Sequence, residues 1–246
     1  MIERAYVRYF ERHPNNENTA IAVVGFDRMG IEVVPFHDVE EIKGFTDLGK
    51  KAMIVGNIGD VWVALKTIGL PRPSALDYPE HLQAFMGRSI KTCTIEEVRR
   101  GNKRTFVKPV SQKLFTGLVF DPENELSRLT LASFEDDTPV IISDVVDFIS
   151  EHRCFVKNHA LVGVKHYKGD WTVTPNASSL GVMMTLGMIA EKPMPEAYAI
   201  DLGVTAEGKT LLVEVNDGYA LGCYGLPGVL YARFLETRWE QFVKDM

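Results

Sequence analysis

The 246-residue sequence lacks several features that would place it in a well-defined class of protein. No apolar run approaches the roughly 18 residues that a membrane-spanning helix needs, so we expect no membrane association. Three cysteines, Cys93, Cys154 and Cys223, are too far apart for a C-x-x-C pair, which excludes a zinc ribbon or a thioredoxin-type motif. The first residues show no signal-peptide pattern, so we expect a cytoplasmic protein with reduced thiols.

The sequence also lacks an excess of positive charge. Its 27 lysines and arginines are outnumbered by 33 acidic residues, which gives a net charge of −6. We therefore expect no nucleic-acid partner. There is no internal repeat, no low-complexity segment, and no Ser/His/Asp or Cys/His arrangement for nucleophilic catalysis. A hydrophobic fraction of 46% is ordinary for a globular protein and excludes a disordered chain. Nothing in the sequence predicts an oligomeric state.

The first part of the chain predicts a small α/β unit. Helix-like and extended patterns alternate there, which is typical of a sheet with a parallel component. The expected helices are 18–29 and 61–70, and the expected strands are 31–36 and 51–57. A proline-rich segment, residues 69–79, is the best linker candidate. We therefore expect a small N-terminal lobe over residues 1–75 and a larger domain over 76–246.

The larger part predicts antiparallel sheet with helices, so the whole chain has an α+β pattern. From Lys103, short β-rich runs alternate with turn residues at regular spacing. The expected strands are 104–110, 117–120, 128–134, 139–146, 153–157, 160–167, 171–175, 197–204 and 210–215. Residues 177–192 and 229–246 are expected to form helices. The last one carries an aromatic stripe for which core packing is favoured over a membrane or partner contact. That stripe consists of Tyr231, Phe234, Leu235, Trp239 and Phe242.

A literal P-loop match spans Gly203–Thr210, but its context argues against a phosphate-binding loop. The motif needs a strand before it and a helix after it, whose first amides face the phosphates. Here the residues from Thr210 onward read TLLVEV, an alternating strand pattern. Glu207 would also place a carboxylate beside the phosphates. We therefore predict a hairpin turn at this segment.

Such a hairpin would bring three oxygen-bearing side chains together. If Glu207 and Gly208 form a two-residue turn, Asp201 lies directly opposite Glu214 in the paired strands. Asn216 is two residues beyond Glu214, so it points to the same face of the sheet. A shift of one residue in the register would remove this opposition.

Two opposed carboxylates need something that offsets their repulsion. Their Cβ atoms would lie ~5 Å apart, and unit charges at that separation repel by roughly 3–4 kcal/mol at an effective dielectric constant of about 20. A cation, or protonation of one group, would offset this cost. Because oxygen ligands suit Mg²⁺ or Mn²⁺, we predict a metal site at Asp201, Glu214 and Asn216. The alternative is an exposed hairpin whose acidic side chains are solvated.

Other charged residues have more than one interpretation. Lys108 lies at the end of an expected strand and precedes a flexible loop, as in a phosphate clamp or a solvated sheet edge. Glu151 and Arg153 alternate along one strand, and the next hairpin would place Glu151 opposite Lys165 or His166. An ordinary cross-strand ion pair is an equally good interpretation of that arrangement.

The order of these motifs resembles the ATP-grasp superfamily, in a short clade related to the RimK-type peptide ligases. The resemblance covers the chain from about Lys103 to the end, and it depends on the segments FVKP, EHRCFV and VEVND occurring in this order. It is weaker over the first hundred residues. It implies an ATP-grasp-like α+β fold, in which a small N-terminal α/β lobe is followed by antiparallel sheets and helices that clasp a nucleotide.

The resemblance implies a nucleotide site. Lys108 would contact the phosphates beneath the loop 111–117, which contributes Lys113, and Glu151 would bind the ribose hydroxyls. The backbone of a hinge would receive the adenine. The hinge residues are Ser143, Asp144, Val145 and Val146.

The resemblance also implies a catalytic group. Arg153 and Lys165 match positions that hold phosphate or the acyl-phosphate, and Asn216 stands beside them. Asp201, Glu214 and Asn216 match the metal-binding residues of the family. Arg88 and Lys91 are the candidates for a second nucleotide-binding cation, which the family carries as a lysine before FVKP.

These features together predict an ATP- and Mg²⁺-dependent (or Mn²⁺-dependent) carboxylate–amine ligase. ADP and phosphate would be its products, and its substrate would be a small molecule or peptide with a carboxylate, joined to an amine acceptor. One alternative is a non-catalytic ATP-binding module that docks on a protein partner, which the absence of a clear second lysine favours. Another is a phosphotransferase that uses the same site.

Overall fold

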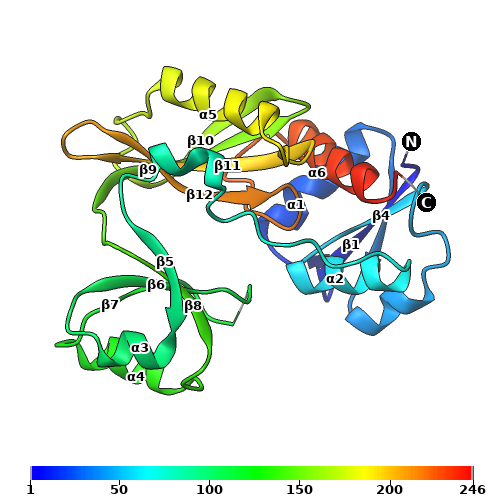
Figure 1. Cartoon of the computed structure of the whole chain (residues 1–246). Coiled ribbons are helices and arrows are strands. Elements are labelled where there is room, and N and C mark those ends of the chain that lie inside the picture. The colour runs from blue at the N-terminus through cyan, green and yellow to red at the C-terminus, as the bar shows by residue number, and fades with distance from the viewer. Residues whose placement is uncertain (1, 113, 245) are drawn as a thin grey trace.

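The computed structural model describes residues 2–112, 114–244 and 246, and its frame is a set of three β-sheets (Figure 1). The first sheet belongs to the N-terminal unit, and β1 is paired in parallel with both β3 and β4. Its strands are β1 (Arg4–Phe10), β2 (His13–Pro14), β3 (Glu32–Phe36) and β4 (Ala52–Val55). The parallel component expected for this part of the chain is therefore confirmed.

Three helical elements accompany this first sheet. They are α1 (Glu17–Arg28), the 3₁₀ helix η1 (Val39–Gly44) and α2 (Ile58–Thr67). Helix α1 begins where Asn16 accepts a hydrogen bond from the Thr19 amide, while the Thr19 hydroxyl accepts one from the Asn16 amide. This reciprocal cap satisfies amides that the first helical turn leaves without partners.

The second sheet is small and entirely antiparallel, with the strand order β5-β8-β6-β7. Its strands are β5 (Ile90–Thr94), β6 (Thr105–Pro109), β7 (Leu118–Phe120) and β8 (Pro139–Ser143). Helices α3 (Ile95–Arg100) and α4 (Glu125–Ala132) cover one face and complete a separate small core. In Figure 1 this unit projects away from the rest of the chain.

The third sheet lies at the centre of the molecule, in the order β10-β9-β11-β12. Its strands are β9 (Phe148–Lys157), β10 (Ala160–Gly169), β11 (Ala197–Thr205) and β12 (Thr210–Asp217). Helix α5 (Ala177–Ile189) and the 3₁₀ helix η2 (Glu80–Phe85) share a hydrophobic core with one face of this sheet. Phe155 and Ala199 face the other way, into the core of the N-terminal unit.

The C-terminal helix α6 (Gly228–Phe242) joins the first sheet to the third. It packs against α1 and β11, and its aromatic stripe lies in the same core as β1 and β4. Tyr231, Phe234 and Trp239 are almost fully buried. The predicted core role of the stripe is confirmed. No helix in the described ranges is both long enough and apolar enough to cross a membrane.

Two expected strands are wrong. Residues 128–134 lie mostly in helix α4, which begins after Asn124 caps the amide of Ser127. The alternating pattern there arose because Leu129 is left exposed while Leu131 is buried. Residues 171–175 form a turn in which Asp170 accepts hydrogen bonds from the amide and hydroxyl of Thr172.

Candidate active site

The segment that matches the P-loop pattern is the hairpin between β11 and β12, as predicted. The Thr205 amide donates to the Lys209 carbonyl at 3.0 Å, and Gly208 has a φ of 76°, in the left-handed region that glycine adopts without strain. Strand β12 begins at Thr210, where a P-loop would start a helix. The literal motif is therefore a turn.

Asp201 does lie opposite Glu214, although the predicted turn is wrong by one residue. Near the turn Val204 pairs with Thr210 instead of Leu211. A register shift between Asp201 and Leu202 then inserts one extra residue in β12 and restores the predicted opposition. The sequence could not show this bulge, because Val213 looks like any other strand residue.

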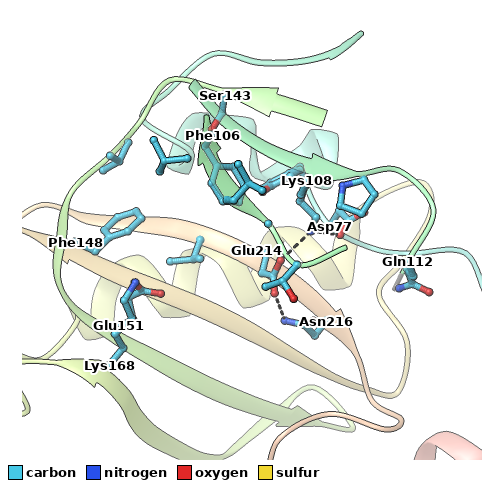
Figure 2. Close-up of a pocket in the computed structure, with 18 of the residues that line it drawn as sticks. Asp77, Phe106, Lys108, Gln112, Ser143, Phe148, Glu151, Lys168, Glu214 and Asn216 are labelled. Carbon is cyan, nitrogen blue, oxygen red and sulfur yellow. Dashed lines mark hydrogen bonds and ion pairs between the residues drawn. The ribbon is translucent and has the colours of Figure 1, made fainter. Parts of the chain in front are cut away.

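A cavity of about 940 Å³ lies between the small sheet, the central sheet and the segment that connects α2 to η2. Figure 2 shows that side chains from β6, β9 and β12 converge on it. The predicted residues that line it are Lys108, Asp144, Val145, Val146, Glu151, Arg153, Glu214 and Asn216. Asp201 and Lys165 are not among the described lining residues, and Lys113 lies outside the described residues.

Lys108 is at the centre of the charged part of the cavity. Its ammonium donates to Asp77 Oδ1 at 2.6 Å and to Glu214 Oε2 at 2.9 Å. Burial alone would lower the pKa of Lys108, but the charges of Glu214 and Asp77 raise it above its ordinary value. For Glu214, burial opposes ionisation, yet Lys108 and a hydrogen bond from Asn216 lower the pKa of the carboxyl group. Both groups are therefore charged at neutral pH.

Asp201 is held by Arg153 in a buried, bidentate ion pair. Arg153 Nε lies 2.8 Å from Asp201 Oδ1, and Nη2 lies 2.7 Å from Oδ2. The Asn216 amide donates to Asp201 Oδ2 and to Glu214 Oε1, each at 3.1 Å. Burial raises the pKa of Asp201 despite the adjacent guanidinium. The three predicted metal ligands thus lie side by side, but Asp201 already uses both of its oxygens.

Glu151 accepts hydrogen bonds from Tyr167 at 2.9 Å and from Lys168 at 2.5 Å. The expected pairing with Lys165 or His166 is wrong, because a register shift in β10 places Lys168 opposite Glu151. Lys165 pairs with Arg153 across the same two strands. Turn position alone could not reveal this shift from the sequence.

The segment after β8 leaves the small sheet and enters the central sheet at Phe148. It forms part of the cavity wall between the aromatic rings of Phe106 and Phe148 (Figure 2). The side chain of Asp144 points to Lys103, which it contacts at 2.6 Å, so its backbone and that of Val145 and Val146 remain as the cavity-forming part. An apolar slot beside exposed backbone suits a flat aromatic base.

Two residues of the site were not assigned by sequence reasoning. Asp77 lies in the predicted linker and carries no motif. Arg88, named only as a candidate nucleotide-binding cation, lines the cavity, and its guanidinium donates to the carbonyls of Leu212 and Val213 at 2.7 and 2.8 Å. Arg88 therefore secures the bulge that aligns Glu214. Lys91, the other candidate, is exposed and is not among the described lining residues.

A second cavity of about 580 Å³ lies beside the first, between α1, α6 and the end of β4. The two share Ile58 and the loop 219–222. Its wall is mainly aromatic and aliphatic, and Glu17 is the one charged side chain among the described residues that line it. The first cavity therefore suits a polyanion, and the second suits an apolar group.

The donor set fits a divalent cation in part. Glu214 and Asn216 present the oxygens that Mg²⁺ prefers, and they face the cavity. Over the described ranges, no three His, Cys, Asp or Glu side chains come together closely enough to hold a metal ion. A cation bound here would depend on Glu214, Asn216 and the oxygens of a bound ligand, as is usual for Mg²⁺ with phosphates.

Comparison with known proteins identifies the class. Residues 85–234 match the model of a family described as an ATP-grasp domain, the second family of its clade. This match covers more than half of the chain, so the protein belongs to the ATP-grasp superfamily. No curated protein matches the chain. The fold and the superfamily expected from the sequence are confirmed.

Solved structures of the same fold cover nearly the whole chain. D-alanine–D-alanine ligase from Bacillus anthracis aligns with a TM-score of 0.60 and 14% identity, over 99% of this chain and 98% of that one. A RimK-domain ATP-grasp protein from Sphaerobacter thermophilus gives 0.61 and 14%, over 95% and 99%. L-amino acid ligase from Bacillus licheniformis gives 0.61 and 10%, over 97% and 75%. The low identities establish a shared fold and nothing finer.

Proposed function

We propose that the protein is an ATP-dependent carboxylate–amine ligase. The observation that carries this proposal is the charged cavity, where Lys108, Arg153, Glu214 and Asn216 meet beside an apolar slot at the hinge. Cations that would hold phosphates and oxygens that would hold Mg²⁺ thus lie next to a place for an adenine. The superfamily match and the ligases named among the similar structures support the same reaction type.

The proposed reaction has two steps that use no side-chain nucleophile. A substrate carboxylate oxygen attacks the γ-phosphorus of ATP, ADP leaves, and an acyl-phosphate forms. An amine nitrogen then attacks the acyl carbon, loses a proton, and releases phosphate. Lys108 and Arg153 would orient the transferred group and stabilise its negative charge. Mg²⁺ held by Glu214 and Asn216 would neutralise the phosphates.

The second cavity is the proposed place for the substrate. It opens to the first through the loop 219–222, so a group bound there would reach the phosphates. Its apolar wall, formed in part by Tyr231, Leu235 and Trp239, favours a substrate with a hydrophobic portion. An amino acid or a peptide end with such a side chain fits this description.

The decisive experiment compares MgATP binding by calorimetry in the wild type, Lys108→Ala and Lys209→Ala. Lys209 belongs to the hairpin turn outside the cavity, so it is the matched control. We expect MgATP binding to be lost with Lys108→Ala and retained with Lys209→Ala. Loss with Lys209→Ala alone would contradict the site. Release of ADP and phosphate with a panel of acids and amines then tests the ligase reaction.

A non-catalytic nucleotide-binding module is the second candidate, and one observation favours it. Arg88, which stands nearest to the position of a second nucleotide cation, is engaged with the carbonyls of Leu212 and Val213. If the wild type binds MgATP but releases no ADP with any acid and amine pair, this candidate replaces the ligase.

A further inference from the structure

Asp77 is held beside the metal-facing strand although it lies in the segment that connects α2 to η2. Its carbonyl accepts a hydrogen bond from the Val215 amide at 2.8 Å, and the two residues form an isolated antiparallel bridge. Its φ of 43° lies in the left-handed region, which aspartate adopts more readily than most residues. Val215 stands between Glu214 and Asn216, so this bridge fixes the Asp77 carboxylate next to both of them (Figure 2).

Asp77 and Glu214 already share one cation. The Lys108 ammonium lies 2.6 Å from Asp77 Oδ1 and 2.9 Å from Glu214 Oε2. These carboxylates are partly open to the cavity, with exposed side-chain fractions of 22% and 30%. Asp201 differs on both counts, because its side chain is 3% exposed and both of its oxygens are bound to Arg153. Asp77 is therefore the more accessible carboxylate.

Entry of a polyphosphate would change the balance of charge around Lys108. Its ammonium would be attracted to the phosphate oxygens, and Asp77 and Glu214 would then face each other without a cation between them. A divalent cation that arrives with the nucleotide would fill this position and would also bind phosphate oxygens. Asn216, which donates through its amide nitrogen to Glu214, would contribute its carbonyl oxygen.

We propose that Asp77, together with Glu214 and Asn216, coordinates the divalent cation of the nucleotide complex, in the role that sequence reasoning assigned to Asp201. This inference rests on the proposed function. It assigns to the connecting segment a direct contact with the cation, so this segment would become part of the wall around the bound nucleotide.

The first test measures Mn²⁺ binding to the protein–ATP complex by electron paramagnetic resonance. We expect Asp77→Asn to weaken Mn²⁺ binding by at least about tenfold, as for the loss of other groups that support a metal site. Asp147→Asn is the matched control, because it removes the same charge from the same cavity wall. We expect it to keep the wild-type Mn²⁺ affinity. Metal-free ATP should bind Asp77→Asn at least as well as the wild type, because a competitor for Lys108 is removed.

The second test detects coordination directly. Asp77→Cys would place a thiolate at the site, and a cadmium–thiolate bond has a charge-transfer band in the ultraviolet. We expect this band with Cd²⁺ and ATP in Asp77→Cys, and its absence in the wild type and in Asp147→Cys. An unchanged Mn²⁺ affinity in Asp77→Asn, or equal bands in the two cysteine variants, overturns the inference. If the wild type itself binds no MgATP, the proposed function fails as well, so the two failures are distinguishable.

Discussion

At the scale of single residues, burial separates the ion pairs that hold this protein together from those that contribute little. The Arg153–Asp201 pair has side-chain exposures of 8% and 3%, and it lies between neighbouring strands of the central sheet. Arg100 and Glu96 form a pair one helical turn apart in α3, with exposures of 77% and 42%. Water solvates the second pair in the folded and the unfolded chain, so its net contribution is small.

Removal of each arginine should therefore give very different results. Arg153→Ala leaves Asp201 as an unpaired buried carboxylate, and we expect it to lower the free energy of unfolding by about 3–5 kcal/mol. Arg100→Ala is the control, with an expected change of under about 0.5 kcal/mol. Urea unfolding followed by circular dichroism measures both values. Equal values for the two variants would show that the buried pair has no special role.

At the scale of elements, the contact between α1 and α6 depends on two glycines. Gly25 of α1 faces Gly228 at the start of α6, and a Cβ atom placed on Gly25 would collide with the Gly228 carbonyl and lie 2.7 Å from the Ala232 Cβ. Such close approach brings the C-terminal helix onto the first helix of the chain. Because α6 also packs on β11, this crossing sets how the N-terminal unit sits against the central sheet.

Alanine at two helical glycines should therefore change stability in opposite directions. Gly25→Ala forces α1 away from α6, and we expect a loss of about 1–3 kcal/mol in the free energy of unfolding. Gly59→Ala, near the start of α2, meets no atom within 4 Å and should gain up to about 1 kcal/mol from the lower entropy of the unfolded chain. Thermal unfolding of both variants measures the shifts. A gain in both would contradict the tight crossing.

At the scale of the whole molecule, the main cavity is bounded by the small sheet, the central sheet and the connecting segment. Lys108 comes from β6, Glu151 from β9 and Glu214 from β12. A ligand in the cavity would therefore contact parts of the chain whose hydrophobic cores are separate. Binding to the folded state alone stabilises it by mass action, and the stabilisation grows with ligand concentration.

This linkage gives a prediction for the metal site. At a MgATP concentration about 100 times its dissociation constant, the wild type should gain about 2.7 kcal/mol in the free energy of unfolding. Glu214→Gln should lose most of this gain and keep its fold, and chelation of Mg²⁺ should have the same effect on the wild type. Glu207→Gln, in the turn of the same hairpin, is the control and should behave as the wild type. Equal protection of the two variants would contradict a metal role for Glu214.

The superfamily, the α+β class and the hairpin that presents Glu214 and Asn216 follow from the amino-acid sequence alone. These features depend on local patterns, which are alternation along strands, turn residues between them and the order of short motifs. The same local patterns failed at α4, where a cap at Asn124 starts a helix over a run that alternates like a strand. Competition between helix and strand over so few residues is decided by the core that buries Leu131.

The details of the site depend on tertiary packing. Strand pairing introduced the shifts that place Lys168 beside Glu151 and that align Asp201 with Glu214. Packing also brought Asp77, 31 residues from Lys108 along the chain, into contact with the Lys108 ammonium. Such contacts depend on how separate sheets come together, and nothing in the residues near Asp77 encodes that arrangement. Local chemistry therefore named the groups, and packing chose their partners.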